Sequence, residues 1–404
     1  MSAGKRGQAQ DAALDAFTGP RRAEVVRLAL DALGEPHHER LLVGVDRVHH
    51  RPEVDTTVVY SVNLSGHDPA EAQPELVILV TTARVPECTS TFVFDDLTLY
   101  TWRHPNDPRL PALAATDDPE RVRAWLPEGR RGGDVRSELL SYRPLRRAVV
   151  RVEAGRQRYY VKMIRPDRAA GLSARHRLMD AAGLGPAVVA EPERGVVVTE
   201  RVPGRSLAHA LAAWHTDETA LPDPAGIPAL LDRLPAELMA MPRRDSWSDR
   251  ADFHGAAAAA AVPSSAAEIA AMTRDIRRLL ADAPTGPLVP THGDFYEANA
   301  FVSGGRFTRV IDVDAAGPGR REDDLACLLG HLAVLPDLSP SHYPRVAEVV
   351  QRWTAVFERQ GNPRALRVRV AGVILSLVAG TTQAHGLARL ELCRAWLYRA
   401  EQGA

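Results

Sequence analysis

One short segment constrains this 404-residue chain more than any other. Residues 291–299 have the sequence Thr-His-Gly-Asp-Phe-Tyr-Glu-Ala-Asn, and Ile-Asp-Val-Asp follows a short apolar strand at 311–314. In phosphoryl transfer, an Asp such as Asp294 accepts the proton of the attacking hydroxyl, while an Asn and a second Asp, here Asn299 and Asp312, hold Mg²⁺ at the phosphates of ATP. The segment therefore predicts an enzyme that moves the γ-phosphate of a nucleotide to a small molecule.

The distribution of lysine supports the same prediction. Of the 50 Lys and Arg residues, only Lys5 and Lys162 are lysines. Lys162 lies in an apolar, strand-like run at 158–164, where an ammonium is costly unless an anionic partner is present. Kinases place one Lys on a strand of the N-terminal lobe to bind nucleotide phosphates. We therefore expect Lys162 to bind the phosphates.

Composition excludes several other classes of protein. With 45% hydrophobic and 25% charged residues, the chain is predicted to be a soluble globular protein. A net charge of −1 gives no electrostatic case for binding nucleic acid. The three cysteines are far apart, no apolar leader is present, and the longest apolar runs (256–262 and 370–379) are too short to span a bilayer. A cytoplasmic enzyme without nucleic-acid or membrane partners is expected, and its oligomeric state is left open.

Hydrophobic periodicity predicts a β-rich first half and a helical second half. Strands are expected at 41–45, 56–64, 75–82, 91–94, 97–102, 147–152, 158–164 and 195–200. Helices are expected at 21–33, 120–126, 172–182, 206–214, 227–241, 266–281, 343–359, 364–387 and 390–399. Ser265 and Glu268 form a capping-box pattern at the start of one helix.

These elements predict an α+β fold with two lobes and an additional N-terminal domain. The expected parts are a flexible tail (1–19), a small α/β cap domain (20–135), a β-rich N-lobe (136–204) and a helical C-lobe (205–404) that carries the catalytic loop. A Gly-rich and Arg-rich stretch at 127–133 is the predicted linker. The cap-like domain contains no motif tied to chemistry. It is interpreted as a cap on the N-lobe, with a partner-binding module as the alternative.

The order of parts over residues 136–404 resembles the aminoglycoside phosphotransferase and choline-kinase-like family, whose members have a bilobal protein-kinase-like fold. That family's catalytic loop is His-Gly-Asp, Leu, His, Pro, Gly, Asn, and the chain has His-Gly-Asp-Phe-Tyr-Glu-Ala-Asn from His292 to Asn299. The family's metal segment begins Ile-Asp-Trp, against Ile-Asp-Val here at 311–313. Its Gly-Asp-Pro, two residues, Asp-Leu-Ala signature matches Gly319 and the Asp324-Leu325-Ala326 run.

The resemblance implies a role for each matching residue, together with ATP and Mg²⁺ as cofactors. Asp294 is implied as the catalytic base, with His292 shaping the same loop. Asn299 and Asp312 are implied as Mg²⁺ ligands, and Lys162 as the ligand of the α- and β-phosphates. Asp324 is implied to brace the loop by hydrogen bonds. The hinge at 199–202, including Glu200 and Val202, is implied to meet adenine through its backbone.

Three departures from the family pattern bear on mechanism. The helix expected to carry a Glu that pairs with Lys162 has only Asp180 as an acid. Glu297 adds a negative charge inside the catalytic loop, near the expected acceptor. Asp314 follows Asp312 by two residues and would share its face on a strand, so that it could also contact metal or substrate.

The acceptor is left open between a sugar, an amino sugar and an aminoglycoside-like compound. From residue 340 to the end there are nine arginines and four acids, a positive surplus that disfavours a polycationic acceptor if these helices line the acceptor site. Two other functions compete with a small-molecule kinase. One is a nucleotide-binding regulator without catalysis. The other is a metal-dependent phosphohydrolase that uses His292, Asp294, Asp312 and Asp314 as a cluster.

Overall fold

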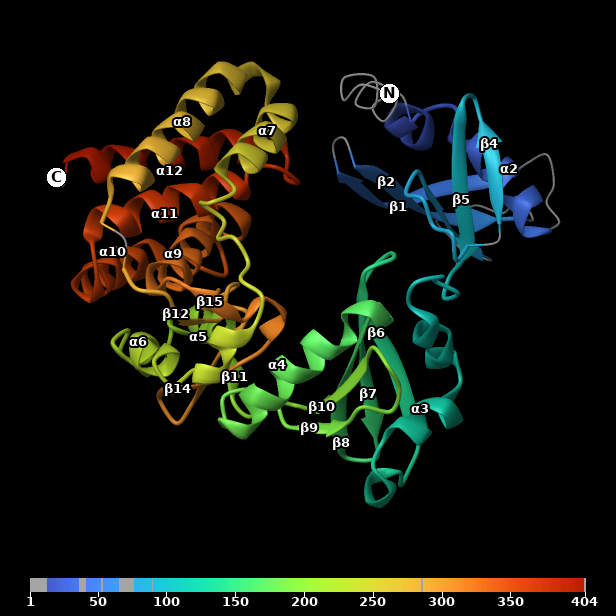
Figure 1. Ribbon diagram of the computed structural model, residues 1–404, viewed down its shortest axis with the longest axis horizontal. Helices are drawn as coiled ribbons and strands as arrows, with labels where there is room; N and C mark the ends of the chain where they lie inside the picture. Colours follow the sequence, from blue (N-terminus) through green and yellow to red (C-terminus); the bar gives the residue numbers. More distant parts are fainter. Residues whose placement is uncertain are drawn as a thin grey trace. The chain divides into compact units, whose positions relative to one another are not determined.

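The computed structural model describes residues 13–35, 41–51, 54–64, 76–88, 90–284 and 286–402. The chain forms two compact units (Figure 1). The first comprises the described residues up to Ala169 together with Val189–Val198, and the second comprises Ala170–Val188 together with the described residues from Thr199 onward. The first unit is rich in strands and the second is mainly helical, which confirms the predicted α+β class.

The first unit begins with a helix packed on an antiparallel sheet. Helix α2 (Arg22–Leu33) ends at the predicted residue, because Gly34 follows it with a φ of 70°. The sheet has the strand order β1-β2-β3-β5-β4. Its strands are β1 (Leu42–Arg51), β2 (Asp55–Asn63), β3 (Leu76–Thr81), β4 (Thr91–Phe94) and β5 (Leu97–Arg103). The strands predicted in this region are confirmed, although β1 is longer than the 41–45 expected.

The prediction of a flexible tail at residues 1–19 is wrong for residues 13–18. Residues 13–18 are helical, and Phe17 is fully buried in the core that α2 shares with the first sheet. Tyr60 of β2 donates a hydrogen bond to the carbonyl of Phe17 at 2.9 Å. The apolar side chains of this segment pack into that core. The prediction missed them because the neighbouring residues in the sequence are polar. Residues 1–12 of the predicted tail lie outside the described residues.

A second sheet follows, in the order β6-β7-β8-β10-β9, and its strands β6, β7 and β8 are antiparallel. Its strands are β6 (Val135–Arg143), β7 (Arg147–Ala154), β8 (Gln157–Ile164), β9 (Val188–Ala190) and β10 (Val196–Glu200). The strands predicted at 147–152, 158–164 and 195–200 are confirmed. Strand β6 was not predicted, because it lies at the sheet edge and most of its side chains are exposed, which removes the alternating pattern.

The first unit has a second buried cluster, to which both of its sheets contribute. Leu79 and Trp102 of the first sheet lie in the same buried cluster as Tyr142, Val150 and Val161 of the second. The 3₁₀ helix η1 (Pro111–Asp117) and helix α3 (Pro119–Trp125) fill the rest of this cluster with Leu113, Val122 and Trp125. The first sheet and its connecting segment therefore cover one face of the second sheet, which is called its rear face below. Lys162 lies on β8 of this second sheet.

The second unit is built of helices with a few short strands. Its helices are α4 (Ala169–Ala181), α5 (Leu207–Ala213), α6 (Gly226–Leu231), α7 (Ala251–Ala261), α8 (Ala266–Asp282), α9 (Arg321–Leu338), α10 (Val346–Phe357), α11 (Pro363–Ser376) and α12 (Gln383–Gln402). Helix α11 packs against both α9 and α12 (Figure 1). The short strands are β11 (Arg205–Ser206), β12 (Val289–Thr291), β13 (Ala300–Ser303), β14 (Arg306–Val310) and β15 (Gly317–Gly319), and they carry the predicted catalytic segment.

Several predicted helix boundaries are wrong for local reasons. The helix predicted at 227–241 ends at Leu231, and a 3₁₀ helix follows Pro235, because proline cannot continue the helical hydrogen bonding. The helix predicted at 364–387 ends at Ser376, and the chain then turns at Gly380 with a φ of 82°. Ser265 forms no capping hydrogen bond, because a 3₁₀ turn at Pro263–Ser265 runs directly into α8.

Helices α7 and α9 were not predicted. In α9, the side chains of a long run from Asp324 to Leu335 are largely buried on all sides, so the helix lacks the one-sided apolar pattern by which surface helices are recognised. Across the described residues, no helix combines the length and the apolar character needed to cross a membrane.

Candidate active site

The predicted catalytic loop connects β12 to β13 and is fixed by a buried carboxylate. The backbone N–H groups of His292 and Gly293 donate to the two carboxylate oxygens of Asp324, each at 2.8 Å. Asp324 lies in the first turn of α9 and is completely buried. Burial raises its pKa, whereas the nearby His292 and the two N–H donors lower it. The hydrogen bonds predicted for Asp324 are therefore present.

His292 uses both ring nitrogens within the loop. Its Nδ1 accepts from the backbone N–H of Asp294 at 3.3 Å, so Nε2 carries the proton that is donated to the carbonyl of Ile311 at 2.8 Å. The residue is fully buried. Gly293 has a φ of 78°, and a Cβ at that position would lie 2.5 Å from the carbonyl oxygen of Ala315. These contacts fix the course of the loop on either side of Asp294.

The same loop brings Asp294, Asn299 and the segment before Asp312 together. Nδ2 of Asn299 donates to the carbonyl of Asp294 at 3.0 Å, and the carbonyl of Asn299 accepts from the N–H of Ile311 at 2.9 Å. Asp312 adopts a left-handed conformation, with φ 58° and ψ 53°. This conformation costs a non-glycine residue about 1–2 kcal/mol, and such strain is concentrated at functional sites.

The prediction that Asp314 shares a strand face with Asp312 is wrong. The strand ends at Val310, and Val313–Ala315 form a 3₁₀ helix, so the two-residue alternation of a strand does not apply. Asp314 instead interacts electrostatically with Arg175 of α4.

The donor set suits a hard cation such as Mg²⁺. Asn299 is buried, and because its amide nitrogen donates to Asp294, its Oδ1 is left as the atom available to a ligand. One amide oxygen and the Asp312 carboxylate match the oxygen ligands that Mg²⁺ prefers, with phosphate and water completing the shell.

Among the described residues, no group of three or more His, Cys, Asp or Glu side chains is gathered for a metal. The cluster that the phosphohydrolase alternative requires is not found in this part of the chain.

Arg175 of helix α4 contacts the segment that follows Asp312. Nε of Arg175 donates to the carbonyl of Ala316 at 2.7 Å, just after the 3₁₀ turn that follows Asp312. Burial lowers the pKa of Arg175, and the charge of Asp314 opposes that shift. Asp180, the only acid of the helix, accepts from the N–H of Val188 at 2.9 Å through Oδ2. Arg175 therefore ties α4 to the segment that carries Asp312.

A comparison of the sequence with protein families gives a match over residues 145–365 to the phosphotransferase enzyme family. That region is more than half of the chain. The chain belongs to this phosphotransferase family. The resemblance seen in the sequence and the prediction of a kinase-type transferase are thereby confirmed. No curated protein matches the sequence.

Solved structures of related enzymes are similar to this phosphotransferase at low identity. A thermostable mutant of aminoglycoside phosphotransferase APH(4)-Ia in its apo form is 18% identical, with 67% of this chain and 97% of that chain covered and a TM-score of 0.45. A choline/ethanolamine kinase family protein from Mesorhizobium loti is 18% identical over 70% and 94%, with a TM-score of 0.46. Choline kinase from Cryptosporidium parvum is 12% identical over 70% and 95%, with a TM-score of 0.47.

The remaining predicted site residues of this family member lie in both units. Lys162 is on β8 in the first unit, with only 8% of its surface exposed. Glu200 ends β10 in the second unit, and its N–H donates to the carbonyl of Ala187 at 2.9 Å. Val202 follows it and is buried. Asp294, His292, Asn299 and Asp312 also belong to the second unit.

Sequence reasoning missed an aromatic pair beside the loop. The ring of Tyr296 stacks on His331 of α9, with a centroid distance of 4.5 Å and an interplanar angle of 25°. Burial, aided by the charges of Asp294 and Asp312, raises the pKa of Tyr296 to about 12. Burial, aided by Arg389, lowers the pKa of His331 to about 4. The spacing of seven residues from Asp324 places His331 on the same helix face, a signal that was lost because α9 was not predicted.

Glu297 occupies an unusual position in the same loop. Only 7% of its surface is exposed, and its Oε2 is buried without a hydrogen-bond partner. Burial raises its pKa to about 7. Its carbonyl accepts from the N–H of Ala208 at 3.0 Å, which anchors the loop to α5.

The arginine surplus in the C-terminal helices is largely offset by acids from other segments. Arg369 forms a buried pair with Asp323 at 2.8 Å. Further ion pairs to acids before residue 340 are Arg345–Glu218, Arg389–Asp337 and Arg394–Glu268. The charge count over residues 340–404 therefore no longer argues against a cationic acceptor.

Proposed function

We propose that this phosphotransferase moves the γ-phosphate of ATP to a hydroxyl group of a small molecule. The observation that carries the proposal is the loop from His292 to Asn299. Asp324 fixes the loop's start, and the Asn299 side chain donates to the carbonyl of Asp294, so the loop holds the proposed base and one proposed metal ligand together. Catalysis of this kind depends on positioning and charge stabilisation rather than on covalent chemistry.

The residues that bind the donor nucleotide follow from the family's pattern. Lys162 contacts the α- and β-phosphates, and the backbone at Glu200 and Val202 meets adenine. Asn299 and Asp312 hold Mg²⁺, which offsets the negative charge of the phosphates when it is bound. The place of Lys162 on β8, the third strand of its sheet, supports its role, because kinases carry the phosphate-binding Lys on the third strand.

In the reaction, Asp294 orients the acceptor hydroxyl and takes its proton. The acceptor oxygen forms a bond to the γ-phosphorus, the bond between that phosphorus and the β,γ-bridging oxygen breaks, and ADP leaves with the bonding electrons. His292 does not exchange a proton with the substrate, because both of its ring nitrogens are engaged within the loop.

The acceptor is a sugar, an amino sugar or an aminoglycoside-like compound. Tyr296 and Glu297 lie within three residues of Asp294 and are the nearest groups in the sequence with the chemistry to contact it. The unpartnered Oε2 of Glu297 suits an acceptor that brings a hydrogen-bond donor.

The test is transfer of labelled phosphate from Mg-ATP to a panel of sugars, amino sugars and aminoglycosides. Asp294→Asn is expected to lower kcat by at least about 10³-fold while nucleotide still binds, because the amide cannot accept the proton. Asp312→Asn is expected to raise the Mg²⁺ requirement about tenfold or more, whereas Asp314→Asn, two residues away, is its matched control and should behave like the parent. If no acceptor in the panel is phosphorylated, while the parent and Asp294→Asn bind nucleotide equally well, the result would instead support a nucleotide-binding regulator.

A further inference from the structure

The turn between β6 and β7 is built differently from the loop that usually covers nucleotide phosphates. In protein kinases that loop is rich in glycine, and the phosphate-binding Lys lies on the third strand. Here β8 is the third strand of the corresponding sheet, and the turn before it, Arg143–Arg146, has the sequence Arg-Pro-Leu-Arg. The N–H of Arg146 donates to the carbonyl of Arg143 at 3.1 Å. Leu145 has a φ of 61°, which costs a residue with a side chain about 1–2 kcal/mol.

A buried carboxylate from outside the turn holds it in this conformation. Oδ2 of Asp107 accepts from the N–H of Leu145 and from the hydroxyl of Tyr142, both at 2.7 Å. Its Oδ1 accepts from the N–H of Arg109 at 2.8 Å. Nε1 of Trp102 donates to the Tyr142 hydroxyl at 3.4 Å. Asp107 is 2% exposed, and hydrogen bonds to a buried ionised group are stronger than neutral ones.

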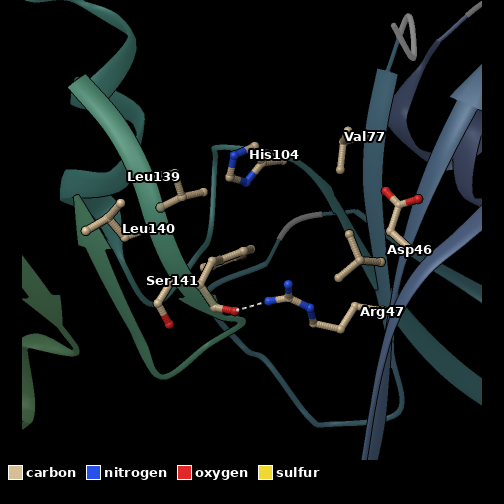
Figure 2. A pocket seen from close by; sticks show the side chains of 9 residues that line it. Asp46, Arg47, Val77, His104, Leu139, Leu140 and Ser141 are labelled. Carbon is tan, nitrogen blue, oxygen red and sulfur yellow. Dashed lines mark hydrogen bonds between the residues drawn. The ribbon is translucent and has the colours of Figure 1, made fainter. Parts of the chain in front are cut away.

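The rest of the contact beside this turn is looser. Figure 2 shows Arg47 of β1 extending toward β6, where its guanidinium donates to the carbonyl of Tyr142 at 3.4 Å. Between the two sheets there is a pocket of about 290 Å³, lined on the β6 side by Leu139, Leu140 and Ser141. Because Arg47 is exposed and its hydrogen bond is long, Asp107 is the firmer of the two connections to the end of β6.

The turn and Lys162 lie at the same end of the sheet. Arg147 pairs with Ile164, and Val149 pairs with Lys162, so Lys162 is two residue pairs from the turn, about 7 Å along the strands. Val161 and Met163 point into the core shared with the first sheet. Since side chains alternate along a strand, Lys162 projects from the opposite face. Asp107 therefore holds the turn from the face that packs against the first sheet. Lys162 projects from the opposite face of the second sheet.

We propose that Asp107 is a positioning residue for the phosphate donor. By holding the Arg143–Arg146 turn in one strained conformation, it fixes the position of the turn relative to Lys162 where the nucleotide phosphates bind. This inference rests on the proposed function. Asp107 precedes the region that matches the family, which begins at residue 145. The segment before that region thus contributes to nucleotide affinity as well as to folding.

The test compares full-length variants in KM for Mg-ATP, in kcat, in affinity for the non-hydrolysable analogue AMP-PNP and in melting temperature. Asp107→Ala is expected to raise KM and the analogue Kd about tenfold, equivalent to about 1.4 kcal/mol, with kcat at saturation within about twofold. Asp107→Asn is expected to fall between parent and Asp107→Ala, because the amide keeps one acceptor oxygen. Ser137→Ala is the matched control: it removes a 2.7 Å hydrogen bond between Thr116 and β6 at the end of the strand away from the turn.

A lowered melting temperature with unchanged KM and analogue affinity in the Asp107 variants would show a purely structural role and overturn the inference. An equal rise in KM for Ser137→Ala would also overturn it. If Asp107→Ala does not fold, Asp107→Asn and Tyr142→Phe carry the test, each with an expected rise of about two- to fivefold. If the parent binds AMP-PNP but transfers no phosphate, the proposed function fails while the affinity series still decides the role of Asp107. If the parent binds no nucleotide, both fail.

Discussion

Replacing Glu297 by Gln is expected to stabilise the protein in a manner that depends on pH. Glu297 is 7% exposed, its Oε2 has no hydrogen-bond partner, and burial raises its pKa from 4.5 to about 7. The folded state therefore favours the protonated form. Its contribution to stability is fully present below pH 4.5 and is lost as the pH rises toward 7. Gln keeps the shape of the side chain and stays neutral, so it does not incur this loss.

The size of the effect follows from the shift. At 1.36 kcal/mol per pKa unit, a rise from 4.5 to about 7 corresponds to about 3 kcal/mol of stability lost above pH 7. At pH 5 the loss is below about 1 kcal/mol, because the carboxyl is still protonated in the folded protein. Glu297→Gln should therefore exceed the parent in free energy of unfolding by about 2 kcal/mol more at pH 8 than at pH 5.

Urea unfolding of both proteins at pH 5 and pH 8 measures this difference directly. Glu237→Gln, at an exposed position in the same unit, is the control and should show no pH-dependent gain. An equal difference between Glu297→Gln and the parent at the two pH values would refute the reasoning. It would mean that the buried carboxyl finds a partner that stabilises its charge. A loss of stability at pH 8 would show that this partner requires the charge.

Two further substitutions test the architecture around the loop. Gly293→Ala should abolish most activity and cost more than about 1 kcal/mol of stability, because its φ of 78° is unfavourable for Ala and the Cβ would meet the backbone. Gly304→Ala is its control: Gly304 has a φ of 57° and open space around it, so this variant should retain activity in the same assays. Arg369→Ala should lower the free energy of unfolding in urea by about 3–5 kcal/mol, because it removes the counter-charge of the largely buried Asp323 carboxylate, which keeps only the hydrogen bond from the N–H of Arg320; an effect below about 1 kcal/mol would show that the pair is solvated.

The parts of the site that could be predicted from sequence are those whose chemistry is local. His292, Asp294 and Asn299 lie within eight residues, so their spacing predicted that they share one loop, and the hydrogen bonds among them agree with this. Their positions relative to Asp312 then followed from one short strand. The left-handed conformation of Asp312 had no such signal in the sequence.

Long-range contributions were the ones that sequence reasoning missed. Arg175 reaches Ala316 across 141 residues, and nothing near either residue indicates the contact. Strand β6 was missed because an edge strand needs no apolar alternation, and α9 because a helix buried on all sides shows no amphipathic face. Fold class was predictable because it depends on the sum of many segments, so errors in single elements did not change it.

The boundary of the phosphotransferase domain is a case in which sequence similarity and folding differ. The family match begins at residue 145, yet strand β6 ends at Arg143 and its partner strands bury their rear face against Trp102, Leu113 and Trp125. Uncovering large apolar side chains costs about 1.5–3 kcal/mol each, and several are involved here, against a typical total stability of about 5–15 kcal/mol. A chain that begins at residue 136 is therefore expected not to fold. Cooperative unfolding of that shortened chain in urea, with nucleotide affinity equal to the parent's, would show that the preceding segment is dispensable. Failure to fold, reversed when residues 76–135 are restored, would make that segment an integral part of the nucleotide-binding unit.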